Sequence, residues 1–155
     1  DINCRNTNQI ADVVSRVYGD DLPARGADGP DPEFHPVESP EGVDKALRGI
    51  LHRLVNEGAI PADRVVILTQ YREAKDRLVG TTSAGMPLGT IGTPGTIAVE
   101  TIYRFKGLEA DATIVILDRL EKVRDHALAY IGLSRARFQL VVVGPAEIGE
   151  SLGLG

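Results

Sequence analysis

Apolar residues in the first third of the chain recur at the spacing of amphipathic helices. The segment from Asn6 to Gly19 places four of them on one face: Ile10, Val13, Val14 and Val17. A second helix is predicted from Ser39 to about Gly58, because serine followed by proline suits an N-cap and the first helical position. Its buried face would carry Val43, Leu47, Ile50, Leu51 and Leu54. Each helix therefore offers one apolar stripe for packing against a sheet.

Short apolar runs later in the chain are typical of buried strands. They are VVILTQ (65–70), TIAVETI (96–102), ATIVILD (112–118) and FQLVVVG (138–144). Helices are predicted over about 71–78 and about 122–135, the latter with an inward face of Val123, Ala127, Leu128 and Ile131. Apolar strands that alternate with amphipathic helices imply right-handed crossovers and a mostly parallel sheet covered on both faces. The pattern therefore predicts a single α/β domain over residues 1–155.

Two segments lack this periodicity. Residues 20–38 (DDLPARGADGPDPEFHPVE) are rich in Pro, Gly and Asp and are predicted to be a flexible acidic loop. Residues 80–95 (GTTSAGMPLGTIGTPG) are predicted to form a loop or a hairpin. The chain also begins at Asp1 rather than at methionine. We therefore expect a fragment of a longer parent protein.

The composition is that of an ordinary globular domain, with 43% hydrophobic and 25% charged residues. The single cysteine, Cys4, excludes a disulfide framework and favours a reducing compartment. No apolar run approaches the roughly 20 residues that span a bilayer. We therefore expect a cytoplasmic protein that has no membrane partner.

The net charge of −5 argues against a protein that binds nucleic acid with its whole surface. Acidic residues gather early in the chain, whereas a set of basic residues lies late: Arg104, Lys106, Arg119, Lys122, Arg124, Arg135 and Arg137. This asymmetry permits a local basic edge on an acidic body.

Several kinds of complete active site are excluded because their motifs are missing from the sequence. The chain has no G-x-x-x-x-G-K-[ST] loop for phosphates and no apolar strand ending in paired acids for magnesium. Its histidines, His35, His52 and His126, are scattered, and no metal site is predicted. The chain alone is therefore not expected to bind ATP tightly or to hydrolyse it.

The segment TIYRFKGLE (101–109) follows a predicted strand, at the sheet end where ligands collect in open α/β folds. Tyr103, Arg104 and Lys106 offer one ring and two cations, which suit a single-stranded backbone and a base face. Glu109 is an acceptor for a ribose hydroxyl. The alternative is a solvated turn with a charged rim.

The segment YIGLSRAR (130–137) is expected to carry Tyr130 and Ile131 into the core and to present Arg135 before the last strand. An arginine on a rigid helix can stabilise the charge that develops during phosphoryl transfer across an interface. Arg137 could do the same or form an ordinary ion pair. The alternative is an exposed helix end, where arginine complements the helix dipole.

Together, and in this order, the two segments resemble motifs V and VI of superfamily 1 helicases of the UvrD/Rep type. The family patterns are Thr-x-His-x-x-Lys-Gly-Leu-Glu and Tyr-Val-x-x-[Ser/Thr]-Arg-Ala. The opening NCRNT (3–7) resembles motif IV, and VVILTQYREAKDRL (65–78) resembles the strand and helix that follow it. The resemblance spans nearly the whole chain. It implies the second, C-terminal RecA-like motor domain of an ATP-dependent DNA helicase, with helices flanking a mostly parallel central sheet in three layers.

The resemblance also implies a role for each matching position. Arg5 and Arg135 would reach the γ-phosphate of ATP, which the N-terminal RecA-like domain of the parent would hold together with Mg²⁺. Glu109 would contact the ribose, and Gly107 would allow close approach of the backbone. Contacts to single-stranded DNA, or to RNA, would come from three positions: Thr101, Tyr103 and Lys106. No cofactor is expected on this chain alone.

Two features depart from the family pattern. Tyr103 stands where the family commonly has histidine, although its ring can still stack or donate a hydrogen bond. Between Leu78 and Thr96 there is room only for a loop or hairpin, where many relatives insert a large domain, so a compact helicase is expected. Two alternatives stay open: a non-catalytic RecA-like interaction or regulatory module, and a parent that joins a helicase to a nuclease.

Overall fold

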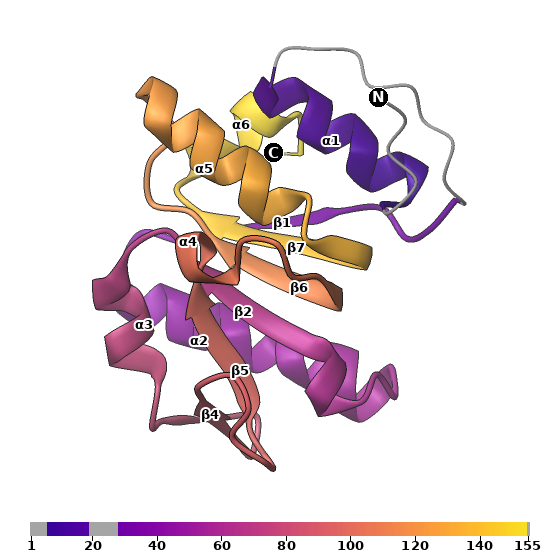
Figure 1. Cartoon of the computed structure of the whole chain (residues 1–155). Coiled ribbons are helices and arrows are strands. Elements are labelled where there is room, and N and C mark those ends of the chain that lie inside the picture. Colours follow the sequence, from indigo (N-terminus) through magenta and orange to yellow (C-terminus); the bar gives the residue numbers. More distant parts are fainter. Residues whose placement is uncertain (1–5, 19–27, 155) are drawn as a thin grey trace.

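The computed structural model describes residues 6–18 and 28–154, and their middle layer is a seven-stranded sheet (Figure 1). The strand order is β1-β7-β6-β2-β5-β4-β3, and every neighbouring pair is parallel except β3 with β4. The strands are β1 (Glu33–Pro36), β2 (Val65–Thr69), β3 (Thr82–Ser83), β4 (Met86–Gly89), β5 (Ile97–Thr101), β6 (Ala110–Ile116) and β7 (Ala136–Gly144).

Helices cover both faces of this sheet. One face packs against α1 (Asn8–Tyr18), α4 (Ile102–Phe105), α5 (Val123–Leu133) and α6 (Ala146–Leu152). The other face packs against α2 (Pro40–Leu51), its continuation η1 (His52–Glu57) and α3 (Arg72–Leu78). A short turn of helix, η2 (Ala62–Arg64), leads into β2. The two helical layers appear above and below the sheet in Figure 1. The predicted three-layer RecA-like α/β architecture is therefore confirmed.

Local sequence signals explain the elements that were predicted well. All five residues of β2 are buried, as expected for a strand covered on both faces. At the start of α2, the Ser39 hydroxyl accepts a hydrogen bond from the Gly42 backbone N–H at 3.1 Å, and Pro40 occupies the first turn. The helix continues to Glu57 because α2 widens into the π-helical segment η1. The predicted helix from Ser39 to about Gly58 is confirmed.

Strand β1 lies inside the segment that was predicted to be a loop. Its residues pair in parallel with β7, with Glu33 opposite Val141 and Pro36 opposite Gly144. Proline is tolerated at this position because β1 is an edge strand, which needs backbone donors on one side only. The loop prediction for 20–38 was thus wrong for residues 33–36. Residues 19–27 lie outside the described part of the chain.

The inward face predicted for α5 was wrong for Val123 and Ala127 but right for Leu128 and Ile131, which are partly buried and pack against the core. Val123 is 88% exposed and Ala127 is exposed, whereas the buried residues of the helix are Asp125, Ala129, Gly132 and Leu133. Small residues belong to this face where α5 packs closely on α4. A Cβ atom on Gly132 would lie 2.8 Å from Ile102 Cδ1. Apolar periodicity does not reveal the part of this face that Ala129 and Gly132 form.

Two further elements complete the chain. The segment 80–95 contains the predicted hairpin, in which β3 and β4 pair in antiparallel fashion. Helix α6 follows Pro145 and was not predicted. No helix in the described ranges combines the length and hydropathy needed to cross a membrane.

Gly144, the last residue of β7, provides a test of the packing at the sheet end. A Cβ atom at this position would lie 2.4 Å from the Leu117 carbonyl oxygen, a backbone atom that cannot move alone. We expect Gly144→Ala to lower the free energy of unfolding by about 1–3 kcal/mol in chemical denaturation.

Gly49 is the matched control, because it lies within α2 and a Cβ atom there meets nothing within 4 Å. Gly49→Ala should raise the free energy of unfolding by about 0.5–1 kcal/mol, since alanine has the higher helix propensity. Equal effects of the two substitutions would contradict the described packing.

Candidate functional site

The amino ends of β6 and β7 bring together three segments that lie far apart in the sequence. Asn6, which belongs to the NCRNT segment, is 2% exposed. Its side-chain amide donates hydrogen bonds to the carbonyl oxygens of Ser134, at 2.9 Å, and of Ala136. The segment that precedes α1 is therefore attached to the segment that carries Arg135. Arg5 directly precedes Asn6 but lies outside the described residues.

Arg135 is buried at this junction, with 8% of the residue exposed. Its Nε donates to the Ile131 carbonyl at 3.0 Å, its Nη1 to the Leu108 carbonyl at 3.1 Å, and its Nη2 to the Ser134 hydroxyl at 3.2 Å. The Arg135 carbonyl accepts from the Ala110 N–H at 3.0 Å. The side chain thus joins the end of α5 to the segment before β6, and its guanidinium is turned into its own domain.

Arg137 and Glu109 form an ion pair beside Arg135, with 3.6 Å between Nη1 and Oε1. The register between β6 and β7 shifts here, because Ala110 lies opposite Ala136 whereas Ala112 lies opposite Gln139. Strand β7 therefore contains one more residue than β6 across this interval, which is a bulge.

As a result of the bulge, the two adjacent residues Arg137 and Phe138 are both exposed. Leu108 is also exposed, at 49%, and Phe138 is 50% exposed. We refer to these residues as the amino-edge cluster: Asn6, Leu108, Glu109, Arg135, Arg137 and Phe138.

Thr101 lies at the opposite end of the sheet. It is the last residue of β5, and its hydroxyl accepts a hydrogen bond from the Arg104 N–H at 3.3 Å. The strand predicted over 96–102 ends here, because the cap at Thr101 starts helix α4. Because β6 is parallel to β5 and begins at Ala110, the segment 101–109 must cross from the carboxyl end of one strand to the amino end of the next. The structure therefore places Thr101 and Glu109 at opposite ends.

The remaining residues of this crossing segment are accessible from outside. Tyr103 is 73% exposed, and Lys106 is exposed where α4 ends. Gly107 has a φ of +90°, a conformation that favours glycine, and a Cβ atom there would meet nothing within 4 Å. Its backbone therefore borders open space.

A buried ion pair supports the start of the crossing segment. Glu100 is 8% exposed, and its Oε2 accepts from Lys75 Nζ at 2.7 Å and from the Thr101 N–H at 2.9 Å. Burial alone would raise the pKa of Glu100, but the hydrogen bonds from Lys75 and Thr101 outweigh it and the pKa is lowered. The pair joins α3 to β5 and holds the backbone of Thr101.

A second network, which was not predicted, holds the loop between β6 and α5. The Gln70 side chain accepts from the N–H groups of Asp118 and Arg119, at 2.7 and 2.9 Å, and donates to the Arg119 carbonyl at 2.9 Å. Asp125 accepts from the Lys122 N–H at 2.9 Å and lies 3.5 Å from Arg119. The hydrogen bonds that the Asp125 carboxylate accepts from backbone N–H groups lower its pKa. Two features of the sequence could have predicted this network: a glutamine directly after a buried strand, and an aspartate in the first turn of a helix.

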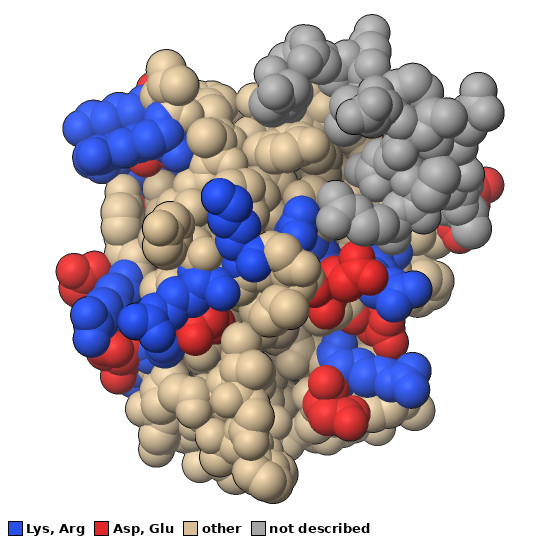
Figure 2. Space-filling view, in the orientation of Figure 1, with Lys and Arg blue, Asp and Glu red and all other residues tan. Residues whose placement is uncertain are grey.

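Basic side chains gather over α4 and the start of α5 on the face shown in Figure 2. The exposed members are Arg104, Lys106, Lys122 and Arg124. The molecule therefore has a local basic surface despite its net charge of −5. Among the described residues, no three His, Cys, Asp or Glu side chains are grouped so that they could hold a metal ion.

A scan against protein-family models and a search of curated proteins both found no match. Among solved structures, the chain is similar to the C-terminal domain of a possible DNA helicase from Lactobacillus plantarum WCFS1. The TM-score is 0.70 at 24% identity, and the match covers 97% of this chain and 92% of that one. The two chains share one fold. A helicase, Arterivirus nonstructural protein 10, matches with a TM-score of 0.45 at 14% identity, over 97% of this chain and 26% of that one.

The hydrogen bonds of Arg135 predict different effects for the two neighbouring arginines. Arg135→Ala removes the donors of two partly buried hydrogen bonds, to the carbonyls of Ile131 and Leu108, so the free energy of unfolding should fall by about 1–3 kcal/mol. Arg137→Ala loses only an exposed ion pair and should have little effect. Urea denaturation of both variants checks this, and equal losses would contradict the structural role of Arg135.

The lowered pKa of Glu100 predicts a dependence of stability on pH. The contribution of Glu100 is fully present above its usual pKa of 4.5 and is lost as the pH falls through the lowered folded-state value. In Glu100→Gln, the free energy of unfolding should be lower at neutral pH and should fall less steeply below about pH 4.5. Urea denaturation across this range measures both effects. An unchanged acid slope in the variant would contradict the assignment.

Proposed function

We propose that this chain is the second motor domain of an ATP-dependent DNA helicase or translocase. The observation that carries the proposal is the amino-edge cluster, where the segments resembling motifs IV, V and VI meet at one end of the sheet. The fold shared with a domain described as part of a possible DNA helicase supports the same function.

The amino-edge cluster would face an N-terminal RecA-like domain that holds ATP and Mg²⁺. Leu108 and Phe138 provide exposed apolar area for contact with that domain. Arg135, together with Arg5, would place positive charge on the γ-phosphate as it is transferred. An arginine in this role accelerates hydrolysis by roughly 10³–10⁵-fold. Glu109 would accept a hydrogen bond from the ribose, and Gly107 would allow the nucleotide to approach the backbone.

When the two domains close on the nucleotide, Arg135 and Glu109 of this domain would have to exchange their present bonding partners for the nucleotide. Arg135 now donates to Leu108 and Ser134, and Glu109 is paired with Arg137. A γ-phosphate is a stronger acceptor than a carbonyl or a hydroxyl, because its hydrogen bonds are charge-assisted. Nucleotide binding would therefore draw Arg135 outward and release Glu109 from Arg137. The intramolecular contacts would keep both groups satisfied while the cleft is open.

The single strand would lie across the carboxyl end, over α4. Thr101, Tyr103 and Lys106 would contact it there, beside the exposed basic residues of α4 and the start of α5. Stacking of a base on an exposed aromatic ring contributes about 1–3 kcal/mol. Because the segment 101–109 joins this surface to the amino-edge cluster, opening and closing of the cleft would displace the strand-contacting residues.

The decisive experiment measures strand-stimulated ATP hydrolysis by the complete protein. Arg135→Ala should lower kcat by roughly 10³-fold or more, and Arg135→Lys should not restore it because lysine lacks the planar guanidinium. Arg137→Ala is the matched control and should leave kcat within a few-fold. Folding of each variant is verified by thermal denaturation.

Unchanged turnover in folded Arg135→Ala would overturn the finger assignment. It would favour a non-catalytic interaction module instead, in which buried Arg135 only connects α5 to β6. Magnesium-dependent ATPase activity of this chain alone, abolished by Arg135→Ala, would also contradict the proposed need for a second domain.

A further inference from the structure

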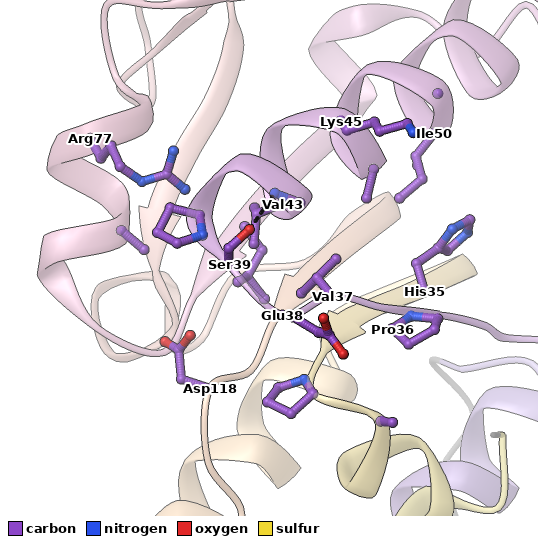
Figure 3. A pocket seen from close by; sticks show the side chains of 18 of the residues that line it. His35, Pro36, Val37, Glu38, Ser39, Val43, Lys45, Ile50, Arg77 and Asp118 are labelled. Carbon is purple, nitrogen blue, oxygen red and sulfur yellow. Dashed lines mark hydrogen bonds between the residues drawn. The ribbon is translucent and has the colours of Figure 1, made fainter.

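A groove of about 1520 Å³ opens at the carboxyl end of the sheet, away from the amino-edge cluster (Figure 3). Its walls are the junction of β1 with α2, the outer side of α2, the start of α3 and the start of α6. The end of β6 contributes Ile116 and Asp118. Crevices at the carboxyl ends of parallel strands are the usual place for ligands in open α/β sheets. The proposed function uses no residue of this groove.

The floor of the groove is apolar. Val43, Ile50 and Ile116 belong to the core and reach the groove from α2 and β6. Ala46 and Ala74 also line the groove, and their small side chains are partly buried. Small side chains at these positions leave room for inserted groups of moderate size. The floor therefore suits aliphatic side chains of a bound segment.

The rim is acidic. Four carboxylates line the groove, and none of them forms an ion pair among the described residues: Glu38, Glu73, Asp118 and Glu147. Arg77 and Arg53 also line it, but their charges are taken by Asp44, at 2.7 Å, and by Glu33. Lys45 is the remaining lysine or arginine of the lining. The unpaired charge of the groove is therefore negative.

This charge disfavours phosphate-bearing ligands, even though helices α2, α3 and α6 begin at the groove. The N-terminus of α2 has used two of its backbone donors, because the Gly42 N–H is bonded to the Ser39 hydroxyl and the Val43 N–H to the Ser39 carbonyl. Glu38 and Glu41 place carboxylates at the same helix end. Nucleic acid would be repelled here, whereas the basic surface over α4 attracts it.

Asp118 follows the end of β6 and is an exposed carboxylate of the groove lining. Figure 3 shows its carboxylate directed toward the start of α2, across from Arg77 on α3. Partial removal from water raises its pKa, although Arg77 opposes the shift, and the nearby charge of Glu73 adds to it. A cation bound at this position would relieve both unfavourable effects on the ionised form.

We propose that the groove binds a segment of a partner protein in which lysine or arginine side chains are separated by small aliphatic ones. One cationic group would pair with Asp118, the others would meet Glu38, Glu73 or Glu147, and the aliphatic groups would lie over Val43 and Ala74. Charge complementarity selects this partner over nucleic acid. The inference does not depend on the proposed motor function.

The first test uses the peptide acetyl-Leu-Arg-Ala-Arg-Leu-amide with the isotope-labelled chain at neutral pH. Amide resonances of groove residues such as Val43, Ala74 and Asp118 should shift on titration. The charge-reversed peptide acetyl-Leu-Glu-Ala-Glu-Leu-amide and an oligodeoxythymidylate should not shift them. Equal binding of the acidic peptide, or shifts at the groove with the oligonucleotide, would overturn the proposal.

The second test removes charge without changing shape. Asp118→Asn combined with Glu73→Gln should weaken binding of the arginine peptide about tenfold or more, because charge-assisted hydrogen bonds are lost. Glu57→Gln removes one charge on η1, outside the groove lining, and serves as the control. Lowering the pH toward 4 should also weaken binding. Because the pKa of Asp118 is raised, this carboxyl takes up a proton at a higher pH than an ordinary aspartate does.

Undiminished binding by the double variant would contradict the inference. These variants leave the amino-edge cluster intact, so their outcome can be separated from that of the Arg135 experiment.

Discussion

The parallel pairing of β6 with β7 is the interaction on which both ends of this domain depend. The two strands lie side by side from Ala110 opposite Ala136 to Ile116 opposite Val143, with helices on both faces. Parallel strands can be joined only by crossovers, so each connection between two parallel strands must leave one end of the sheet and return at the other. The bulge near the amino end exposes Arg137 and Phe138, and the carboxyl end carries the loop held by Gln70.

Backbone carbonyls hold the candidate site together more than side-chain ion pairs do. Asn6 and Arg135 are both buried, and both direct side-chain donors to main-chain oxygens of neighbouring segments. A buried polar group without a partner is costly, so these contacts restrict how the three segments can be arranged. The exposed pair of Arg137 with Glu109 is screened by water and can open at little cost. The candidate site thus combines two firmly held buried side chains, Asn6 and Arg135, with an exposed ion pair that opens easily.

The fold class could be predicted because buried strands and capped helices leave local signals, such as the VVIL run and the Ser39–Pro40 pair. Strand β1 could not, because four residues ending in Pro36 form a strand only through pairing with the distant β7. The motif residues of the site could be recognised from sequence, but the direction of the Arg135 side chain could not. That direction depends on the Leu108 carbonyl, which is 27 residues away along the chain.

The two edges of the sheet share one property. At one edge β3 has two residues, and at the other β1 has four residues and ends in Pro36. Edge strands this short present few free backbone groups for pairing with another chain. Growth of the sheet by strand addition is therefore disfavoured on both sides. Assembly of this domain with other proteins is left to the side chains of its faces and ends, where contacts can be made and broken repeatedly.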